Sequence, residues 1–356
     1  MFKHLRLENF RNHKKYEIEF DQITVLVGLN GAGKSNILEA VTVLSSCRSF
    51  REDEKKSLIN FDSDYARVVG DDLEVFITKT PRLFMQAKER GAPRKLSSFI
   101  GLLPTVVFSS ETISIISGSP SDRRRFLDVM ISQLSGEYLR ALIDYKKVKQ
   151  QRNNLLQTVR MGEGSEQELS FWDEELARLS GVIVKQREDA ISFINGLLPG
   201  LYCSISGDPA ACLKICYKKN FEGDVREALI RCRYREIACG KTLFGPHRDD
   251  MIFELDGRNM TNFASRGEIR SAILALKIAE LKYLETKRES LVSGDNIIRP
   301  ILLLDDIFSE FDPERRAHLG ELVSQYQSLV TATEESHLSP QLLKKSKVIE
   351  IIKPNG

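Results

Sequence analysis

The sequence lacks long hydrophobic runs. No stretch of about 18 consecutive apolar residues, the length that a membrane-spanning helix needs, occurs in its 356 residues. The first residues mix Lys3, His4, Arg6 and Glu8 with apolar positions, whereas a signal peptide has an uninterrupted apolar segment. We therefore expect a cytoplasmic protein without a membrane partner.

Cysteine and net charge are also low. The six cysteines are too few for a disulfide framework in a chain of this length, and their spacing matches no zinc site. Buried, reduced thiols are expected at Cys47, Cys203, Cys212, Cys216, Cys232 and Cys239. Lys and Arg number 52 against 50 Asp and Glu, a formal net charge of +2, so a nucleic-acid site would have to be a local cluster of basic residues.

The N-terminal part has an α/β pattern. An antiparallel pair is expected over 2–7 and 16–20, and a buried strand over 23–27 leads into a glycine-rich segment. A helix should run from that segment to about Ser46. Short alternating segments over 65–87 predict a small antiparallel sheet.

Helical patterns then dominate. One runs from Ser121, the expected cap, to about Arg160, and a second follows the break at 162–165 and lasts to about Leu198. Each helix would have on the order of 35 residues and a length of about 50 Å, so the two predict a helical hairpin far shorter than a long coiled coil. The α/β alternation returns with a strand over 251–255, a helix over 265–287 and a strand over 301–304.

The segment 28–35, GLNGAGKS, fits the pattern G-x-x-x-x-G-K-[ST] between a buried strand and a helix, as a phosphate-binding loop requires. Its backbone N–H groups would face phosphates, Lys34 would bridge the terminal phosphates, and the Ser35 hydroxyl would ligate Mg²⁺. ATP and Mg²⁺ are the predicted cofactors. The predicted nucleotide-binding residues here are Gly28, Leu29, Asn30, Gly31, Ala32, Gly33, Lys34, Ser35 and Asn36.

The apolar strand over 301–304 ends in two carboxylates. Asp305 is expected to hold the Mg²⁺ together with Ser35, and Asp306 to orient the attacking water, so Lys34 and Asp306 are the predicted catalytic residues. Many parallel strands end at a polar loop, so this feature alone would be weak evidence. The phosphate loop in the same chain makes the functional interpretation the favoured one.

Ser265 to Glu268, SRGE, would alone indicate an ordinary helix cap with an acid three residues on. The order along the chain gives it a second meaning. A phosphate loop, an S-x-G-[QE] helix start, an apolar strand ending in Asp-Asp and the segment SEFD at 309–312 follow one another as in ABC-type ATPases.

Other motifs make the chain resemble the RecF family of bacterial DNA-repair proteins, over nearly its whole length. They are LENFRN at 7–12, Asn36 with Leu38 and Glu39, RSFR at 48–51, VFS at 107–109 with Glu111, RRFLD at 124–128, GPHRDD at 245–250 and LLDDIFSEFD at 303–312. Two positions depart from related patterns. Glu268 stands where the family often has Gln, and ABC transporters have Glu in place of Asp306 and a switch histidine that this chain lacks.

The resemblance implies an α/β fold: an ABC-type, SMC-like P-loop ATPase head with a mostly helical inserted second lobe and no long coiled coil. The expected division is a first ATPase part at 1–118, the inserted lobe at 119–240 and a second ATPase part at 241–356. The implied activity is that of an ATP-dependent, DNA-binding recombination mediator with slow, DNA-linked ATP hydrolysis. It would act at gapped DNA with RecR and RecO to help load RecA, in DNA repair and the SOS response.

The resemblance further implies a homodimer that forms on ATP. Ser265 and Gly267 would reach the partner's γ-phosphate, the segment 309–312 would align the two sites, and 331–333 would be the switch segment. Two alternatives stay open. One is an SMC-like head that only assembles partners and has no DNA surface; the other, a transporter ATPase, requires the missing histidine.

The basic residues allow no assignment from sequence, since solvated helix faces give the same pattern as a phosphate-tracking surface. The candidate clusters are Arg123 to Arg125, Lys146, Lys147 and Lys149 with Arg152, Arg231, Arg233 and Arg235, and Arg48 with Arg51. His247 and Arg248 are interpreted as a packed loop between the lobes rather than as a site.

Overall fold

The computed structural model describes residues 1–291 and 298–353, which form two compact units. The first unit comprises Met1–Ile113, Ser204–Gly207 and Arg270–Gly356, and the second comprises Ser114–Cys203 and Asp208–Ile269. Residues 241–269 thus lie in the second unit, whereas the sequence placed them in the ATPase lobe. The reason is that β10 (Asp250–Leu255) pairs antiparallel with β9 (Leu213–Lys218).

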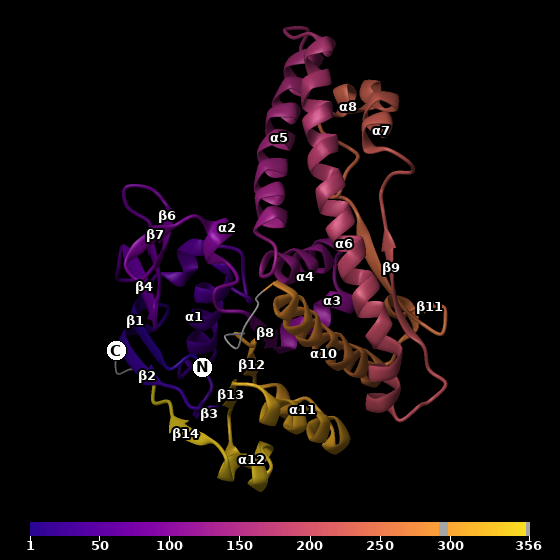
Figure 1. Ribbon diagram of the computed structural model, residues 1–356. Helices are drawn as coiled ribbons and strands as arrows, with labels where there is room; N and C mark the ends of the chain where they lie inside the picture. Colours follow the sequence, from indigo (N-terminus) through magenta and orange to yellow (C-terminus); the bar gives the residue numbers. More distant parts are fainter. Residues whose placement is uncertain (292–297, 354–356) are drawn as a thin grey trace. The chain divides into compact units, whose positions relative to one another are not determined.

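A parallel sheet of five strands forms the base of the first unit, in the order β14-β3-β13-β12-β8 (Figure 1). The strands are β3 (Ile23–Val27), β8 (Thr105–Phe108), β12 (Ile301–Asp305), β13 (Ser328–Ala332) and β14 (Lys347–Glu350). Most residues of β3, β12 and β13 are buried, as the near-continuous apolar runs of a covered parallel sheet require. Because all five strands run the same way, their carboxyl ends meet at one edge.

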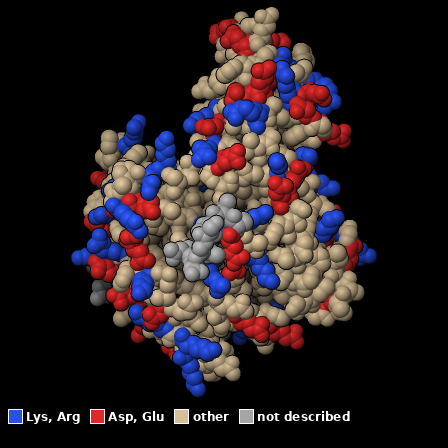
Figure 2. Space-filling model, in the orientation of Figure 1, with Lys and Arg blue, Asp and Glu red and all other residues tan. Residues whose placement is uncertain are grey.

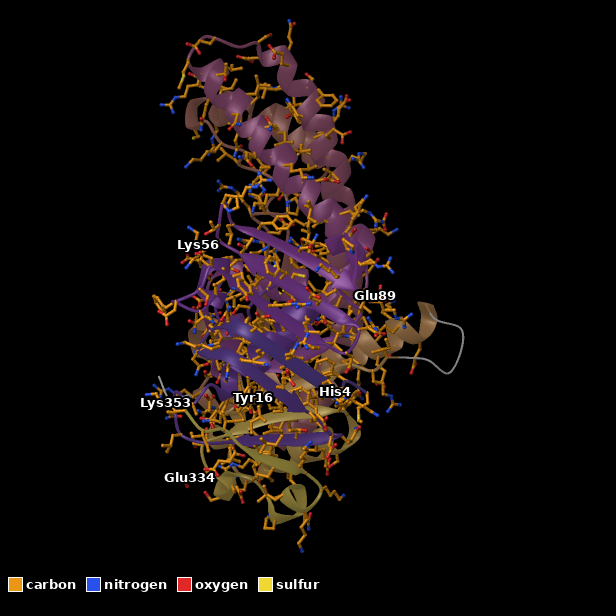
Figure 3. The ribbon with its side chains drawn as sticks, turned by 90° about the vertical axis from the view of Figure 1, so that its left-hand side faces the viewer. His4, Tyr16, Lys56, Glu89, Glu334 and Lys353 are labelled. Atoms are coloured by element: carbon orange, nitrogen blue, oxygen red, sulfur yellow. The ribbon has the colours of Figure 1, made fainter. Side chains whose placement is uncertain are left out.

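An antiparallel sheet of six strands, in the order β2-β1-β4-β5-β6-β7, packs with α1 (Lys34–Ser46) into the core of the same unit. Figure 3 views it with His4 on β1, Tyr16 on β2 and Glu89 on β6 labelled. Its strands are β1 (His4–Phe10), β2 (His13–Glu19), β4 (Tyr65–Gly70), β5 (Leu73–Thr78), β6 (Phe84–Glu89) and β7 (Ala92–Arg94). The sequence indicated two separate sheets here; they are one because β1 pairs with β4.

The second unit contains the predicted helical hairpin, formed by α5 (Gly136–Arg160) and α6 (Leu169–Ser206), which lie side by side (Figure 1). The first helical pattern is split, because α4 (Pro120–Ser132) ends before α5 begins, and Ser119 rather than Ser121 caps α4. The second runs on past Leu198 and Pro199. Tyr202 and Ile205 are buried beyond the proline, so an apolar face continues through it.

Shorter elements complete both units. The helices are α2 (Leu96–Phe99), α3 (Ser114–Ser117), α7 (Val225–Arg231), α8 (Arg233–Cys239), α9 (Met260–Phe263), α10 (Arg266–Leu291), α11 (Pro313–Gln325) and α12 (Pro340–Lys344). The strand β11 (Arg258–Asn259) pairs with β10, so the second unit also holds a three-stranded sheet. No helix within the described residues has the length and apolarity to cross a membrane.

All six cysteines are free, as expected, but the expectation that all are buried is wrong. Cys47 is buried, and burial raises the pKa of its thiol to about 12. Cys212 and Cys239 are exposed.

A buried ion-pair network holds the second unit together. The Arg152 guanidinium is fully buried and donates to Asp173 Oδ1 at 2.7 Å, Glu236 Oε2 at 2.6 Å and Thr242 Oγ1 at 3.0 Å. Arg233 donates to the other oxygen of Asp173 at 2.5 Å. Arg152 and Arg233, which the sequence grouped with candidate DNA-binding residues, are therefore internal cross-links.

Arg152→Met should destabilise the second unit by about 3–5 kcal/mol, because it leaves buried carboxylates without their cation. Urea unfolding measures the change. The matched control is Arg226→Met: Arg226 pairs with Glu174 at the surface, with side chains 51% and 60% exposed, and such a pair is worth about 1 kcal/mol or less. Equal unfolding free energies for the two variants would contradict the structural role of Arg152.

Candidate nucleotide site

The glycine-rich loop joins the carboxyl end of β3 to the start of α1. Gly33 is the N-cap of α1, with a left-handed backbone at φ 106° and no side-chain hydrogen bond to the helix. A Cβ at this position would lie 2.6 Å from His13 Nε2, so only glycine fits. The first turn of α1 also has no acidic residue. The start of α1, with its first N–H groups and the positive end of the helix dipole, is thus open to an anion.

Lys34 lies folded over this loop. Its ammonium donates to the carbonyl oxygens of Gly28 at 2.6 Å and Leu29 at 3.1 Å, and the residue is only 6% exposed. Burial lowers the pKa of Lys34, and the negative charges of Asp306 and Asp305 oppose that effect. Leu29, by contrast, is 83% exposed. The loop thus presents a cation beside its open helix end.

Ser35 and Asp305 meet as predicted. The Ser35 hydroxyl donates to Asp305 Oδ1 at 2.6 Å, and the Thr331 hydroxyl donates to the same oxygen at 2.8 Å. Burial raises the pKa of Asp305, while these two hydrogen bonds lower it. A hydroxyl and a carboxylate oxygen side by side are the hard ligands that Mg²⁺ prefers, so these residues fit that ion.

Asp306 follows with a left-handed backbone, φ 51° and ψ 23°. Its N–H donates to Thr331 Oγ1 at 2.9 Å, and its carbonyl oxygen accepts from Ser309 Oγ at 2.6 Å. In the described part of the chain its carboxylate has no hydrogen-bond partner, and its charge acts on Lys34. The backbone is therefore fixed while the carboxylate stays available to a ligand.

Two further acids belong to this edge of the sheet. Burial raises the pKa of Glu310; Arg270 lowers it, and the charges of Asp306 and Glu111 raise it further. Glu111 also raises the pKa of Asp305. Sequence reasoning used Glu111 only as a motif residue. Its place just after β8, the neighbour of β12, was the signal that could have put it here.

A set of polar residues braces the loop helix, and sequence reasoning gave most of them no role. Asn36 Nδ2 donates to Asn12 Oδ1 at 2.7 Å, and His13 Nε2 lies 3.2 Å from the Gly33 carbonyl oxygen. Arg51, one of the basic candidates, donates to Asn36 Oδ1 at 3.0 Å and so lies beside the loop helix.

The fully buried carboxylate of Glu39 extends this bracing. It accepts two hydrogen bonds from Arg11, at 2.8 and 2.6 Å, and one from Ser49 at 2.5 Å. The motifs at 7–12 and 48–51 therefore position α1.

Ser265 and Gly267 lie in the second unit, at the start of α10, whereas the loop 28–35 lies in the first. The Ser265 N–H donates to Glu268 Oε2 at 2.6 Å and the Glu268 N–H donates to Ser265 Oγ at 3.2 Å, which is a capping box. Hydrogen bonds to Ser265 lower the pKa of Glu268. Ser265 thus caps the helix and is also exposed, so the segment agrees both with an ordinary helix cap and with a signature that reaches a partner subunit.

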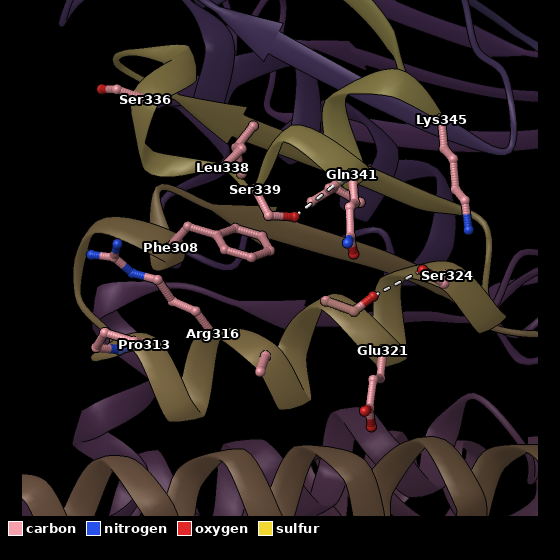
Figure 4. A pocket seen from close by; sticks show the side chains of 13 residues that line it. Phe308, Pro313, Arg316, Glu321, Ser324, Ser336, Leu338, Ser339, Gln341 and Lys345 are labelled. Atoms are coloured by element: carbon pink, nitrogen blue, oxygen red, sulfur yellow. Dashed lines mark hydrogen bonds between the residues drawn. The ribbon is translucent and has the colours of Figure 1, made fainter.

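A separate pocket of about 520 Å³ lies in the first unit between α11 and the segment around α12 (Figure 4). Phe308, Arg316 and Lys345 are among its lining residues. None of the predicted site residues lines it, so it is distinct from the phosphate loop.

Comparison with known proteins agrees with this geometry. A family model described as "RecF/RecN/SMC N terminal domain" matches residues 1–353. A protein of Roseiflexus castenholzii named "DNA replication and repair protein RecF" is 34% identical over 97% of this chain and 96% of its own length. The protein of the same name from Lachnoclostridium phytofermentans is 34% identical over 98% of this chain and 97% of its own.

Solved structures give the same result. "Structure of the recombination mediator protein RecF-ATP in RecFOR pathway" has a TM-score of 0.88 and 29% identity, covering 99% of this chain and 96% of that one. The corresponding RecF-ATPrS structure has a TM-score of 0.84 and 30% identity, covering 95% and 94%. An Smc head, at 17% identity and a TM-score of 0.51, shares the fold. The ABC-type, SMC-like head expected from the sequence is thus confirmed.

Thr331→Val should make binding of magnesium nucleotide fail at a higher pH than in the wild type. The change removes a hydrogen bond that lowers the raised pKa of Asp305, so the carboxyl becomes protonated, and loses its charge for the cation, earlier as the pH falls. Calorimetric titrations over a descending pH series measure the midpoint. Asp305→Asn, which has no carboxyl to titrate, is the control and should bind weakly throughout. An unshifted midpoint would contradict the prediction.

Proposed function

Because the chain belongs to the RecF family of DNA replication and repair proteins, within the wider RecF/RecN/SMC group, we propose that it is an ATP-dependent DNA-binding recombination mediator. The observation that carries the ATP site is the 2.6 Å hydrogen bond between Ser35 Oγ and Asp305 Oδ1, beside the open start of α1 and the Lys34 ammonium. RecF proteins solved as ATP and ATPrS complexes support the choice of nucleotide.

Each group at the site has a proposed task. The N–H groups of the loop and of the α1 start hold the phosphates, and Lys34 exchanges its two carbonyl partners for terminal phosphate oxygens. Ser35 and Asp305 hold Mg²⁺, which when bound neutralises charge on the β- and γ-phosphates. Asp306 accepts a hydrogen bond from the attacking water, since its carboxylate has no other partner among the described residues.

ATP would also join two copies of the chain. In a two-fold dimer, the exposed Ser265 and the half-buried Gly267 of one subunit complete the phosphate site of the other. The Ser309 hydroxyl donates to the Asp306 carbonyl oxygen, so the segment 309–312 that would face the partner is bonded directly to the water-orienting residue. Closure and hydrolysis are coupled through that bond.

The wider function follows the family: action at gapped DNA, with RecR and RecO as partners, to help load RecA during DNA repair and the SOS response. Slow, DNA-linked hydrolysis would release the dimer from DNA. The alternative is an SMC-like head that assembles partners without its own DNA surface. The face shown in Figure 2 favours this alternative, because Lys and Arg are intermixed there with Asp and Glu and form no extended basic surface.

Asp306→Asn should keep ATP binding and lose at least about 100-fold in turnover, because the amide preserves the shape but not the charge that positions the water. Its ATP-bound dimer should live longer than the wild-type dimer. Single-turnover hydrolysis and light scattering measure the two effects. Lys34→Ala, which should abolish ATP binding itself, separates loss of chemistry from loss of nucleotide. Wild-type turnover in Asp306→Asn would remove this residue from the mechanism.

Mixing Lys34→Ala with Ser265→Arg tests the shared site. Each variant alone should be nearly inactive, but a mixed dimer has one site with an intact phosphate loop and an intact serine. With unbiased pairing and independent sites, half of the dimers are mixed, so about a quarter of the wild-type ATPase activity should return. The opposing result is a Ser265→Arg protein that stays monomeric in ATP and hydrolyses at the wild-type rate.

A further inference from the structure

The loop 240–250 of the second unit is held unusually firmly against α5. Tyr145 and His247 form a hydrogen bond of 2.6 Å through Nδ1, and His247 Nε2 lies 3.3 Å from the Thr242 carbonyl oxygen. The carbonyl oxygen accepts from Nε2, and in the neutral ring Nδ1 then accepts from the Tyr145 hydroxyl. Burial and the charge of Lys149 lower the pKa of His247 to about 3, which keeps it neutral at physiological pH.

Glycine makes this approach possible. Gly245 has φ 127°, and a Cβ there would overlap the Tyr145 hydroxyl. Asn220 bonds the loop at three points: its side chain accepts from the Gly245 N–H at 2.9 Å and donates to the Leu243 carbonyl at 3.2 Å, and its backbone N–H donates to Asp249 Oδ1 at 2.9 Å. These bonds fix the backbone of the loop on both sides of Arg248, the residue that follows His247.

Arg248 is exposed and lies close enough to Lys149 on α5 for its charge to act there, as does that of Lys146. The charges that act on Lys149 are all positive, namely those of Lys146, Arg248 and Arg124, and together with burial they lower its pKa. In the described part of the chain, no ion pair includes Lys146, Lys149 or Arg248. The neighbouring Lys147, in contrast, pairs with Asp144 at 3.1 Å.

Arg123 and Arg124, two other basic candidates on the second unit, do not share this property. Arg123 forms a bidentate ion pair with Asp250, with N–O distances of 2.6 and 2.9 Å. Arg124 donates to the Asp249 carbonyl oxygen, and the charges of Asp250, Asp128 and Asp249 act on it. Its guanidinium is therefore engaged within the second unit and is not counted in the cluster.

Such a cluster works against folding. Like charges three apart on a helix repel, and burying part of Lys149 beside other cations removes solvation without a compensating partner. A feature that costs stability and is nevertheless held rigid is explained by a ligand that supplies the missing negative charge. The exposure of Lys146 and Arg248 favours an extended anion that stays partly in solvent.

We propose that Lys146, Lys149 and Arg248 form a preorganised site for consecutive phosphates of a DNA backbone on the second unit. The site rests on the proposed DNA function and supplies a location for it. Because the loop and α5 already hold the backbones of these residues in place, DNA binding orders less of the protein than binding to a flexible segment would. The contacts carry no sequence information, as a mediator that acts at gaps of any sequence requires.

Fluorescence anisotropy with gapped duplex DNA, in ATP and over a salt series, tests the site. Lys149→Gln and Arg248→Gln should each weaken binding, and the double variant should lower the slope of log affinity against log salt by about 1.8, or about 0.9 per lost contact. Lys147→Gln removes the same charge from the same helix and should leave the slope near that of the wild type. Lys149→Arg should retain binding.

Thermal unfolding and ATP affinity separate this role from a structural one. Lys149→Gln should melt no lower than the wild type, since it relieves repulsion, and ATP affinity should not change. If Lys149→Gln fails to fold, the exposed Arg248→Gln decides alone. Unchanged affinity and slope in variants of a wild type that binds DNA would overturn this site but not the proposed function. A wild type that binds no DNA in ATP at any salt concentration would overturn both.

Discussion

The hydrogen bond between Ser35 and Asp305 joins residues 270 positions apart, and it depends on the fold of the whole first unit. It forms only if β3 and β12 run parallel on either side of β13, so that the phosphate loop and the carboxylate leave the sheet at the same edge. The chain between them includes the whole second unit. That insertion is tolerable because loop-closure entropy grows only slowly with length.

The same geometry explains which site residues were predictable. The phosphate loop is a local pattern whose strand, glycines and helix are adjacent in sequence, so 28–35 could be identified without the fold. Glu111 and His13 were not placed, because Glu111 follows β8, whose partner β12 is remote in the sequence, and His13 reaches the loop only through a contact to the Gly33 carbonyl oxygen 20 positions along the chain. The division at 241–269 was mistaken for a related reason: β9 pairs with β10 across the chain, with Lys218 opposite Asp250, 32 positions away, and such a pairing leaves no local signal.

Charge was the hardest property to interpret. Arg123 and Arg152 look like surface arginines in sequence, but their carboxylate partners include residues 127 and 84 positions away, respectively. Each partner turns a candidate ligand into a cross-link. Lys146 and Arg248, in contrast, are exposed, and none of the ion pairs among the described residues includes them. Clusters of basic residues therefore become informative only after the internal ion pairs have been subtracted.

Thr331 joins Asp305, the proposed magnesium ligand, to Asp306, the proposed water-orienting residue. One hydroxyl donates to the Asp305 carboxylate and accepts from the Asp306 N–H, so a movement of either residue disturbs the other. The left-handed backbone of Asp306 also bears on the choice of side chain. A short carboxyl residue tolerates that conformation better than most, because it can hydrogen-bond locally. The aspartate therefore fits a turn that a longer glutamate would strain, and in the proposed mechanism its shorter reach toward the attacking water accounts for slow hydrolysis that releases the dimer.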